Sequence, residues 1–342
     1  MALVEIRDLT KAFDVRGGMS GGGGTVKAVN GIDLDIEEGE TLGLVGESGC
    51  GKSTLGRCIT RLIEPTSGTI RFEGQELQSM DAKRLRAARR RFQTIFQDPY
   101  ASLNPRMRVG EIIGEGLEIH GLARGRARRE MVLSLMRRVG LREEHYSRYP
   151  HEFSGGQRQR IGIARALVFK PRFIVADEPV SALDVSIQAQ ILNLLQDLQE
   201  EMNLTFLFIS HDLRVVEHVS RRLAVMYLGR IVEIGPAGTL YREPRHPYTR
   251  ALLSAVPVVD PAQRRERIVL SGDVPSQVNP PSGCSFHPRC PFRQPVCSER
   301  MPELLPTPEG TKIACHVFGP QPVEGVAQAR ARRGGPAEAP TL

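Results

Sequence analysis

Residues 46–53 read Gly-Glu-Ser-Gly-Cys-Gly-Lys-Ser, and Thr54 follows them. This stretch fits the pattern G-x-x-x-x-G-K-[ST], in which glycines let backbone N–H groups converge on phosphate oxygens that a side chain would block. A short apolar run at residues 41–45 precedes it as a buried strand, and a helix is expected from Lys52 onward. That helix points the positive end of its dipole at the same anion. The stretch predicts a nucleotide-binding loop made of Gly46, Ser48, Gly49, Gly51, Lys52, Ser53 and Thr54.

A second motif supplies the acidic groups that ATP hydrolysis requires. Residues 173–176 form an apolar strand, and Asp177 and Glu178 follow it directly. Because neighbouring parallel strands end at one edge of a sheet, both carboxylates should lie beside the nucleotide. We expect Lys52 to reach the β- and γ-phosphates, Ser53 and Asp177 to hold Mg²⁺, and Glu178 to polarise the attacking water. Alone, such an acidic pair often merely caps the next helix, and the phosphate loop favours the functional interpretation.

Alternating strand and helix patterns around these motifs define the fold class. Strands are expected at residues 1–12, 32–36, 41–45, 173–176 and 205–209, and helices at 161–168 and 187–198. This alternation predicts an α/β fold with a mainly parallel sheet covered by helices. Residues 98–150 carry apolar spacings typical of helices. A glycine-rich insertion at residues 17–24 is a loop by composition, and we expect the Ala-, Gly-, Pro- and Arg-rich tail, residues 321–342, to be disordered.

The composition is that of a globular protein. The 342 residues suit two or three structural units, and no apolar run approaches the roughly 20 residues that cross a bilayer. The N-terminus lacks the layout of a secretory signal, so we expect a cytoplasmic protein whose membrane contacts run through a partner. The net charge of +7 could indicate nucleic acid, but the basic clusters at residues 83–91 and 124–129 fall in helical segments with few aromatic residues. We interpret them as solvated helix faces and expect no nucleic-acid partner.

One further stretch narrows the class of ATPase: residues 154–160 read Ser-Gly-Gly-Gln-Arg-Gln-Arg. Taken alone, it is a Ser/Gly helix cap whose bare glycine amides form another anion site. It also resembles the signature sequence of ABC-type ATPases. The resemblance implies that Ser154 and Gly156 of one subunit clasp the γ-phosphate held by a second subunit. It further implies a P-loop NTPase core of the RecA-like type, an ABC ATPase core with an inserted helical subdomain.

Four other positions match ABC ATPases in the expected order along residues 1–240. Gln97 matches the glutamine that contacts Mg²⁺ and water and senses the membrane partner. Asp184, which ends Ser-Ala-Leu-Asp, matches the loop that crosses the dimer interface. His211 matches the histidine that contacts the γ-phosphate, although a lone histidine at a strand end is usually structural. Phe13 is the candidate for stacking on adenine, with a core position as the alternative.

The C-terminal part resembles a narrower group. The stretches at residues 246–253, 270–275 and 279–284, as well as residues 46–56 and 96–105, are similar to the ATPases of oligopeptide and dipeptide importers, and most similar to the second of their two ATPases. The resemblance implies ATP-driven peptide import at the cytoplasmic face of the cell membrane. It implies as partners a sister ATPase, two membrane permeases and an extracytoplasmic substrate-binding protein. Nickel importers share this layout, so the cargo stays open.

Four cysteines cluster near the C-terminus, at Cys284, Cys290, Cys297 and Cys315, with the spacing C-x₅-C-x₆-C-x₁₇-C. In a cytosolic chain such a cluster indicates a metal before disulfides. Four thiolates suit either an iron–sulfur cluster or tetrahedral zinc, and none of the gaps is the C-x₂-C of zinc ribbons. The family resemblance implies a [4Fe–4S] cluster. Zinc and four unliganded thiols remain the alternatives.

These observations divide the chain into four parts: an ATPase core at 1–97 and 158–235, a helical signature subdomain at 98–157, a Cys-rich C-terminal extension at 236–320, and the tail at 321–342. One alternative function is a soluble ABC ATPase acting on nucleic acid or ribosomes. Such proteins typically carry two cassettes or a long coiled-coil insertion, which this sequence does not show. A regulatory module without turnover would require the loss of Lys52 or Glu178, and both are present.

Overall fold

The computed structural model describes residues 2–15, 24–256 and 266–320. The expected disordered tail at 321–342 lies outside these residues, as does all of the glycine-rich insertion except Gly24. Gly24 is the first residue of strand β2 and not part of a loop. It pairs there with Val15, the last residue of β1, because antiparallel pairing with β1 satisfies its backbone groups.

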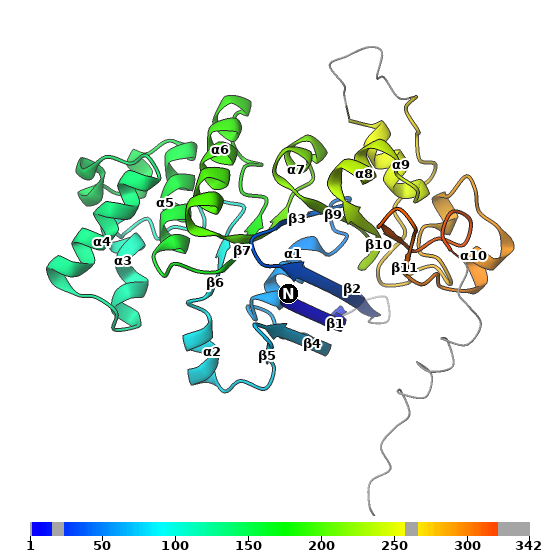
Figure 1. Cartoon of the computed structure of the whole chain (residues 1–342), viewed down its shortest axis with the longest axis horizontal. Helices are drawn as coiled ribbons and strands as arrows, with labels where there is room; N and C mark the ends of the chain where they lie inside the picture. The colour runs from blue at the N-terminus through cyan, green and yellow to red at the C-terminus, as the bar shows by residue number, and fades with distance from the viewer. Residues whose placement is uncertain (1, 16–23, 257–265, 321–342) are drawn as a thin grey trace, which may run out of the picture.

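An eight-stranded sheet runs through the molecule in the order β11-β12-β10-β9-β3-β8-β7-β6 (Figure 1). The pairs β9-β3, β3-β8, β8-β7 and β7-β6 are parallel. The pairs β11-β12, β12-β10 and β10-β9 are antiparallel. Their bounds are β3 Thr41–Val45, β6 Phe92–Ile95, β7 Phe173–Asp177, β8 Thr205–Ile209, β9 Arg222–Tyr227, β10 Arg230–Pro236, β11 Leu305–Pro306 and β12 Lys312–Ile313. The expected α/β fold with a mainly parallel sheet is confirmed, with an antiparallel edge.

A second, antiparallel sheet of four strands lies beside the first in the order β2-β1-β4-β5 (Figure 1). Its strands are β1 Ala2–Val15, β2 Gly24–Glu37, β4 Ser67–Phe72 and β5 Gln75–Glu76. Helix α1, Lys52–Ile59, contacts β2 of this sheet and also β7 and β8 of the main sheet. Its buried face is apolar, and Leu55 and Cys58 are fully buried there. The helix that follows the phosphate loop is therefore fixed between the two sheets.

The other helices of the described residues lie around the two sheets, with α2 on the same side of the main sheet as α1, and α5, α6 and α7 on the opposite side (Figure 1). They are α2 Ala82–Ala88, α3 Val109–Ile119, α4 Gly125–Arg138, α5 Gly155–Leu167, α6 Val185–Met202, α7 Leu213–Val219, α8 Ala237–Arg242, α9 Pro247–Ser254 and α10 Pro295–Glu299, with 3₁₀ turns at Glu143–Ser147, Pro150–Glu152 and His287–Arg289. Helices α3, α4 and α5 pack on one another, and α7 packs on β3. None of the helices in the described ranges is long and apolar enough to cross a membrane.

The central strands are buried on both faces, which explains their uninterrupted apolar sequence. In β7 the residues alternate between two hydrophobic clusters: Ile174 and Ala176 face one, and Phe173 and Val175 face the other. The strand predicted at 173–176 extends by one residue, so that Asp177 is the last residue of the strand itself. That residue is consequently almost fully buried.

Two boundaries differ from the sequence-based expectation. Helix α5 begins at Gly155 and not at Ile161, because Ser154 caps it: the Gln157 N–H donates to Ser154 Oγ at 3.4 Å, and Gln157 Oε1 accepts from the Ser154 N–H at 3.1 Å. Glycines carry no apolar periodicity, so the hydrophobic spacing marks only the later part of this helix, whereas the Ser/Gly cap in residues 154–160 marks its start. At the other end, β12 pairs with β10, and the main sheet therefore runs across the boundary predicted at residue 235.

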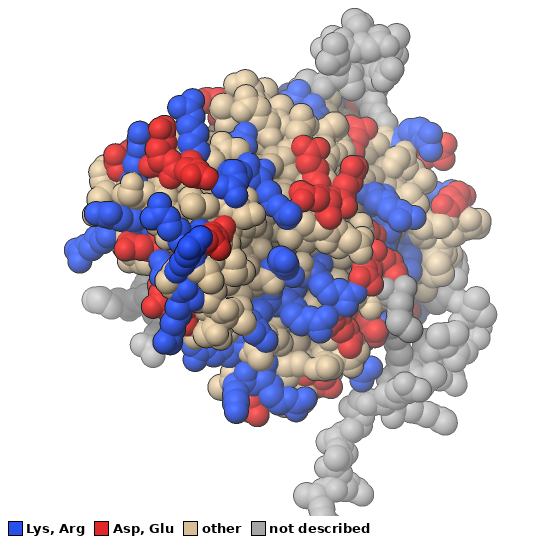
Figure 2. Space-filling model, turned by 60° about the vertical axis from the view of Figure 1, so that its left-hand side comes forward, with Lys and Arg blue, Asp and Glu red and all other residues tan. Residues whose placement is uncertain are grey.

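The basic helices carry acidic neighbours. Arg126 pairs with Glu130 at 2.7 Å, Arg128 pairs with Glu118, and Arg91 pairs with Glu73. On the face drawn in Figure 2, the basic side chains are interspersed with acidic ones. Such mixed surfaces are typical of solvated helix faces.

Candidate functional site

Three neighbouring parallel strands end at the candidate site. Strand β3 leads from Val45 into the glycine-rich loop, β7 ends at Asp177, and β8 ends at Ile209, directly before Ser210 and His211. Asp177 is in register with Ile209, and Ile209 with Leu44. Because all three strands point the same way, the loop, the acidic pair and the histidine meet at one edge of the sheet.

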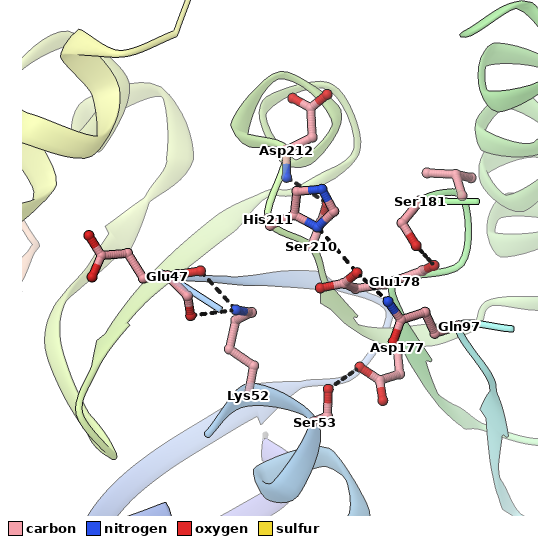
Figure 3. A network of polar contacts seen from close by, with 12 residues as sticks. Glu47, Lys52, Ser53, Gln97, Asp177, Glu178, Ser181, Ser210, His211 and Asp212 are labelled. Carbon is pink, nitrogen blue, oxygen red and sulfur yellow. Dashed lines mark hydrogen bonds and ion pairs between the residues drawn. The ribbon is translucent and has the colours of Figure 1, made fainter. Parts of the chain in front are cut away.

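The loop between β3 and α1 adopts a backbone that only glycine accommodates at two positions. Gly51 has a φ of 109°, and a Cβ there would lie 1.9 Å from the carbonyl oxygen of Ala28. Gly46 has a φ of 154°, and a Cβ there would lie 2.2 Å from the carbonyl oxygen of Met226. Lys52, which is buried, folds back over the loop and donates to the carbonyl oxygens of Gly46 at 2.8 Å and Glu47 at 3.1 Å (Figure 3). Its ammonium group is thus held above the loop that would receive phosphate.

The first residues of α1 face the end of β7. Ser53 Oγ donates to Asp177 Oδ1 at 2.7 Å (Figure 3). Burial raises the pKa of Asp177, although the Ser53 hydroxyl opposes this rise by stabilising the carboxylate. A hydroxyl oxygen and a carboxylate oxygen at this separation are the hard donors that Mg²⁺ prefers. Ser53 and Asp177 therefore fit that ion, whereas Gln97, the third predicted ligand, donates to Glu178.

Glu178 is the meeting point of the remaining predicted residues. Gln97 Nε2 donates to Glu178 Oε2 at 2.8 Å, and His211 Nδ1 lies 3.2 Å from the same oxygen (Figure 3). Glu178 itself has a φ of 49°, uncommon for a residue with a side chain. Its backbone N–H donates to the carbonyl oxygen of Ile209 at 2.9 Å, which fixes this conformation against β8. Four residues of the predicted machinery, Lys52, Gln97, Glu178 and His211, are thus brought to one sheet edge.

The other predicted residues lie elsewhere on the chain. Ser154 is exposed and bonds within its own helix, to Gln157. A Cβ on Gly156 would lie 2.5 Å from Ile187 on α6, so this turn packs against that helix. Asp184 occupies the position directly before the first turn of α6, where its side chain makes no capping hydrogen bond, and it is exposed. Phe13, on β1, is 38% exposed, with the Lys11 ammonium 4.9 Å from its ring centroid. An exposed ring of this kind is available for stacking, and the core alternative does not hold.

The four C-terminal cysteines lie near one another. The Cys284 N–H donates to the carbonyl oxygen of Cys297 at 2.8 Å. Burial raises the pKa of Cys284 to about 11, and the other three thiols add to that rise. However, no three His, Cys, Asp or Glu side chains in the described ranges are placed to hold a metal ion. The predicted four-thiolate ligand set is therefore not present in this arrangement; burial favours neutral thiols, whereas a metal requires thiolates.

Sequence reasoning missed a group of residues that reach the loop from the C-terminal part. The Glu47 N–H donates to the Tyr248 hydroxyl at 2.8 Å, and Arg289 pairs with the Glu47 carboxylate. In the sequence, the stretch that contains Tyr248 carries only the family resemblance. No local pattern could have signalled these contacts, because about 200 residues separate the partners.

Comparisons with known proteins decide the family. The model "ABC transporter" matches residues 29–181, and the model "Oligopeptide/dipeptide transporter, C-terminal region" matches residues 232–297. The oligopeptide transport ATP-binding protein AppF of Bacillus subtilis is 53% identical over 320 residues, 92% of this chain and 97% of AppF. YkfD of the same organism is 56% identical over 321 residues, 93% of this chain and 96% of YkfD. The chain belongs to the ABC transporter ATP-binding proteins.

Solved structures agree with this assignment. The ABC ATPase is similar to the dimeric cassette MJ0796 in a post-hydrolysis state bound to ADP and Pi, with 30% identity, a TM-score of 0.61, and coverage of 68% of this chain and 98% of that one. It is also similar to cbiO1 of Clostridium perfringens, with 27% identity, a TM-score of 0.61, and coverage of 71% and 91%. The ABC ATPase fold and the ATPase class predicted from residues 154–160 are confirmed.

Proposed function

We propose that this ABC ATPase hydrolyses ATP at the sheet edge around Glu178 and thereby powers peptide import. The observation that carries the proposal is the convergence of Gln97 and His211 on the Glu178 carboxylate, beside a phosphate loop that presents Lys52. Glu178 thus has two polar partners that follow different strands, Gln97 after β6 and His211 after β8. Asp177 is occupied by Ser53.

The chain's own residues divide the chemistry among them. The backbone N–H groups of the loop and the Lys52 ammonium bind the β- and γ-phosphates, and Phe13 stacks on adenine. Ser53, Asp177 and Gln97 hold Mg²⁺, which neutralises phosphate charge when bound. Glu178 accepts a hydrogen bond from the attacking water and orients it, and His211 donates to the γ-phosphate. For this to happen the His211 ring must turn from Glu178 toward the nucleotide.

The site as described is one half of a composite. Ser154 and Gly156 lie at the start of α5, and Asp184 lies at the start of α6. Ser154 and Asp184 are exposed, whereas Gly156 is buried where the first turn of α5 packs on Ile187 of α6. We propose that Ser154 and Gly156 bind the γ-phosphate of the ATP held by a second subunit, and that Asp184 contacts that subunit across the dimer interface. The second subunit is a sister ATPase in a heterodimer. The neighbour MJ0796 is dimeric in its solved structure, which supports a dimer for this chain.

The helical residues 98–157 and the C-terminal residues 236–320 serve the transport partners in this proposal. We place the helical subdomain, with α3 and α4, against two membrane permeases at the cytoplasmic face of the membrane, and Gln97 at its base relays contact to Glu178. An extracytoplasmic substrate-binding protein delivers cargo to the complex. Peptides are proposed as cargo because AppF is an oligopeptide transport protein; nickel is the alternative.

For the four clustered cysteines we propose a [4Fe–4S] cluster, with zinc as the alternative. What supports a metal is the proximity of four free thiols in one partly buried region. What stands against it is the present placement of their side chains. Binding would require the thiols to lose their protons and turn toward a common centre.

Replacement of Glu178 by Gln tests the proposed function. The amide keeps the shape and the bond to Gln97 but cannot accept a proton, so we expect MgATP binding to persist while ATP turnover falls by about 10²-fold or more. In vesicles carrying the complete transporter, uptake of labelled peptide should fall in parallel. The matched control is Glu143→Gln. Glu143 is an exposed residue whose carboxylate pairs with Arg137 at 2.6 Å. Wild-type turnover in Glu178→Gln would refute the assignment, and turnover without peptide uptake by the intact transporter would refute the cargo.

A further inference from the structure

The C-terminal part of the chain contacts the phosphate loop at three points. Tyr248 on α9 accepts the Glu47 N–H at 2.8 Å. Gln277 Nε2 donates to the carbonyl oxygen of Gly49 at 2.6 Å. Arg289 Nη1 donates to both carboxylate oxygens of Glu47, at 3.2 and 2.9 Å. Two loop residues, Glu47 and Gly49, are thus bonded to residues that follow the ATPase cassette in sequence.

The contact with Arg289 also solves an electrostatic problem. Glu47 is an acidic residue inside a loop built to bind anions, and an uncompensated carboxylate there would weaken the attraction of the loop for the phosphates of ATP. Burial alone would lower the pKa of Arg289, but the interactions with Glu47 and Tyr227 together outweigh burial, and the pKa is raised. The guanidinium is only 9% exposed, so solvent screens the pair weakly. Arg289 therefore neutralises the negative charge of Glu47 within the phosphate loop.

Packing holds these contacts in place. Tyr248 and Phe286 are fully buried, with ring centroids 5.5 Å apart, and both pack on Tyr227 of β9 at 4.6 and 5.3 Å. Arg289 ends the 3₁₀ turn His287–Arg289, which directly follows Phe286. The aromatic cluster thus joins the turn, α9 and the main sheet into one packed unit. A side chain anchored in this way can fix the position of the loop.

We propose that Arg289 and Tyr248 are positioning residues for nucleotide binding: the C-terminal extension braces the phosphate loop and neutralises Glu47. The inference rests on ATP binding at this loop. It assigns to the extension a direct effect on nucleotide affinity, separate from any contact with transport partners. Neither residue touches the reacting atoms, so the effect falls on affinity and not on turnover at saturating ATP.

Titration of the full-length chain with MgATP, read by displacement of a fluorescent nucleotide, tests the brace. Arg289→Gln should raise the Kd for MgATP by about tenfold, because Glu47 is left uncompensated beside the phosphates. Adding Glu47→Gln to that variant should return the Kd to within about threefold of wild type, since the repulsion is gone. Arg245→Gln, which breaks an ion pair with Glu309 within the same extension, should leave the Kd unchanged.

Tyr248→Phe gives a second measurement that keeps the aromatic packing. It removes only the acceptor for the Glu47 N–H and should weaken MgATP about three- to tenfold, with turnover at saturating ATP close to wild type. A folded Arg289→Gln variant with wild-type affinity, or a double variant no tighter than Arg289→Gln, would overturn the brace. So would a Tyr248→Phe variant with unchanged affinity. A wild-type chain that bound no MgATP would overturn the proposed function, and the brace with it.

Discussion

Alanine at position 51 should distort the phosphate loop. Gly51 has a φ of 109°, and a Cβ there would lie 1.9 Å from the carbonyl oxygen of Ala28, where real contacts stay above 3.0 Å. The loop or β2 must therefore move by about 1 Å in a close-packed region. The positive φ costs about 1–2 kcal/mol, and the displaced backbone about 1–3 kcal/mol more. We expect Gly51→Ala to lower the free energy of unfolding by about 2–5 kcal/mol.

Gly49→Ala separates the two causes. Gly49 lies in the same loop with a φ of 78°, and a Cβ there would meet nothing within 4 Å. This variant should lose only the conformational part, about 1–2 kcal/mol. Urea unfolding followed by circular dichroism measures both free energies, and a MgATP titration should show at least about tenfold weaker binding for Gly51→Ala. Equal losses of stability in the two variants would refute the contact with Ala28 as the reason for glycine at position 51.

Three further predictions concern other parts of the ATPase. His246 is completely buried, and burial lowers its pKa to about 3. Between about pH 6 and pH 4 the unfolded state therefore binds a proton at this histidine that the folded state does not bind. The free energy of unfolding should fall by about 1.4 kcal/mol per pH unit as the pH drops through this range. His246→Asn, which keeps a capping acceptor for the Tyr248 N–H, should flatten this slope in urea titrations at several pH values. Ser53→Ala removes the partner of buried Asp177, so Mg²⁺-dependent ATP turnover should fall at least about tenfold, while an unchanged Mg²⁺ dependence would contradict the assigned ligand. Anaerobically purified protein should contain iron and sulfide that Cys297→Ser reduces, and a colourless, iron-free, zinc-loaded sample would exclude the iron–sulfur proposal.

The centre of the site could be predicted from the sequence because parallel strands impose it. An apolar run followed by Asp177 and Glu178, and another followed by His211, could only end at the edge where the phosphate loop begins. The motifs fixed which chemical groups would meet, and the fold added how they meet: Gln97 and His211 share one oxygen of Glu178. The sequence could not show this sharing, since it depends on side-chain orientation at the ends of three different strands.

The boundaries were less predictable where glycine and capping replace apolar periodicity. The first turn of α5 contains two glycines and is stabilised by the reciprocal bonds of Ser154 and Gln157, so hydrophobic spacing located only its later part. The C-terminal strands were also missed. β11 and β12 have two residues each, too few for an alternating pattern. β12 forms because β10 offers it an unpaired edge, and β11 pairs in turn with β12.

Glu47 shows why a motif can be correct and still incomplete. The pattern G-x-x-x-x-G-K-[ST] treats position 47 as free, because any residue there leaves the glycine amides and the lysine in place. The charge at position 47 nevertheless matters, because a carboxylate in an anion-binding loop weakens the electrostatic attraction between the loop and the phosphates. The chain keeps Glu47 and neutralises it with Arg289, 242 residues further on. The extension that follows the cassette is therefore part of the nucleotide site's electrostatics, and a cassette cut before residue 289 should bind MgATP more weakly than the full chain.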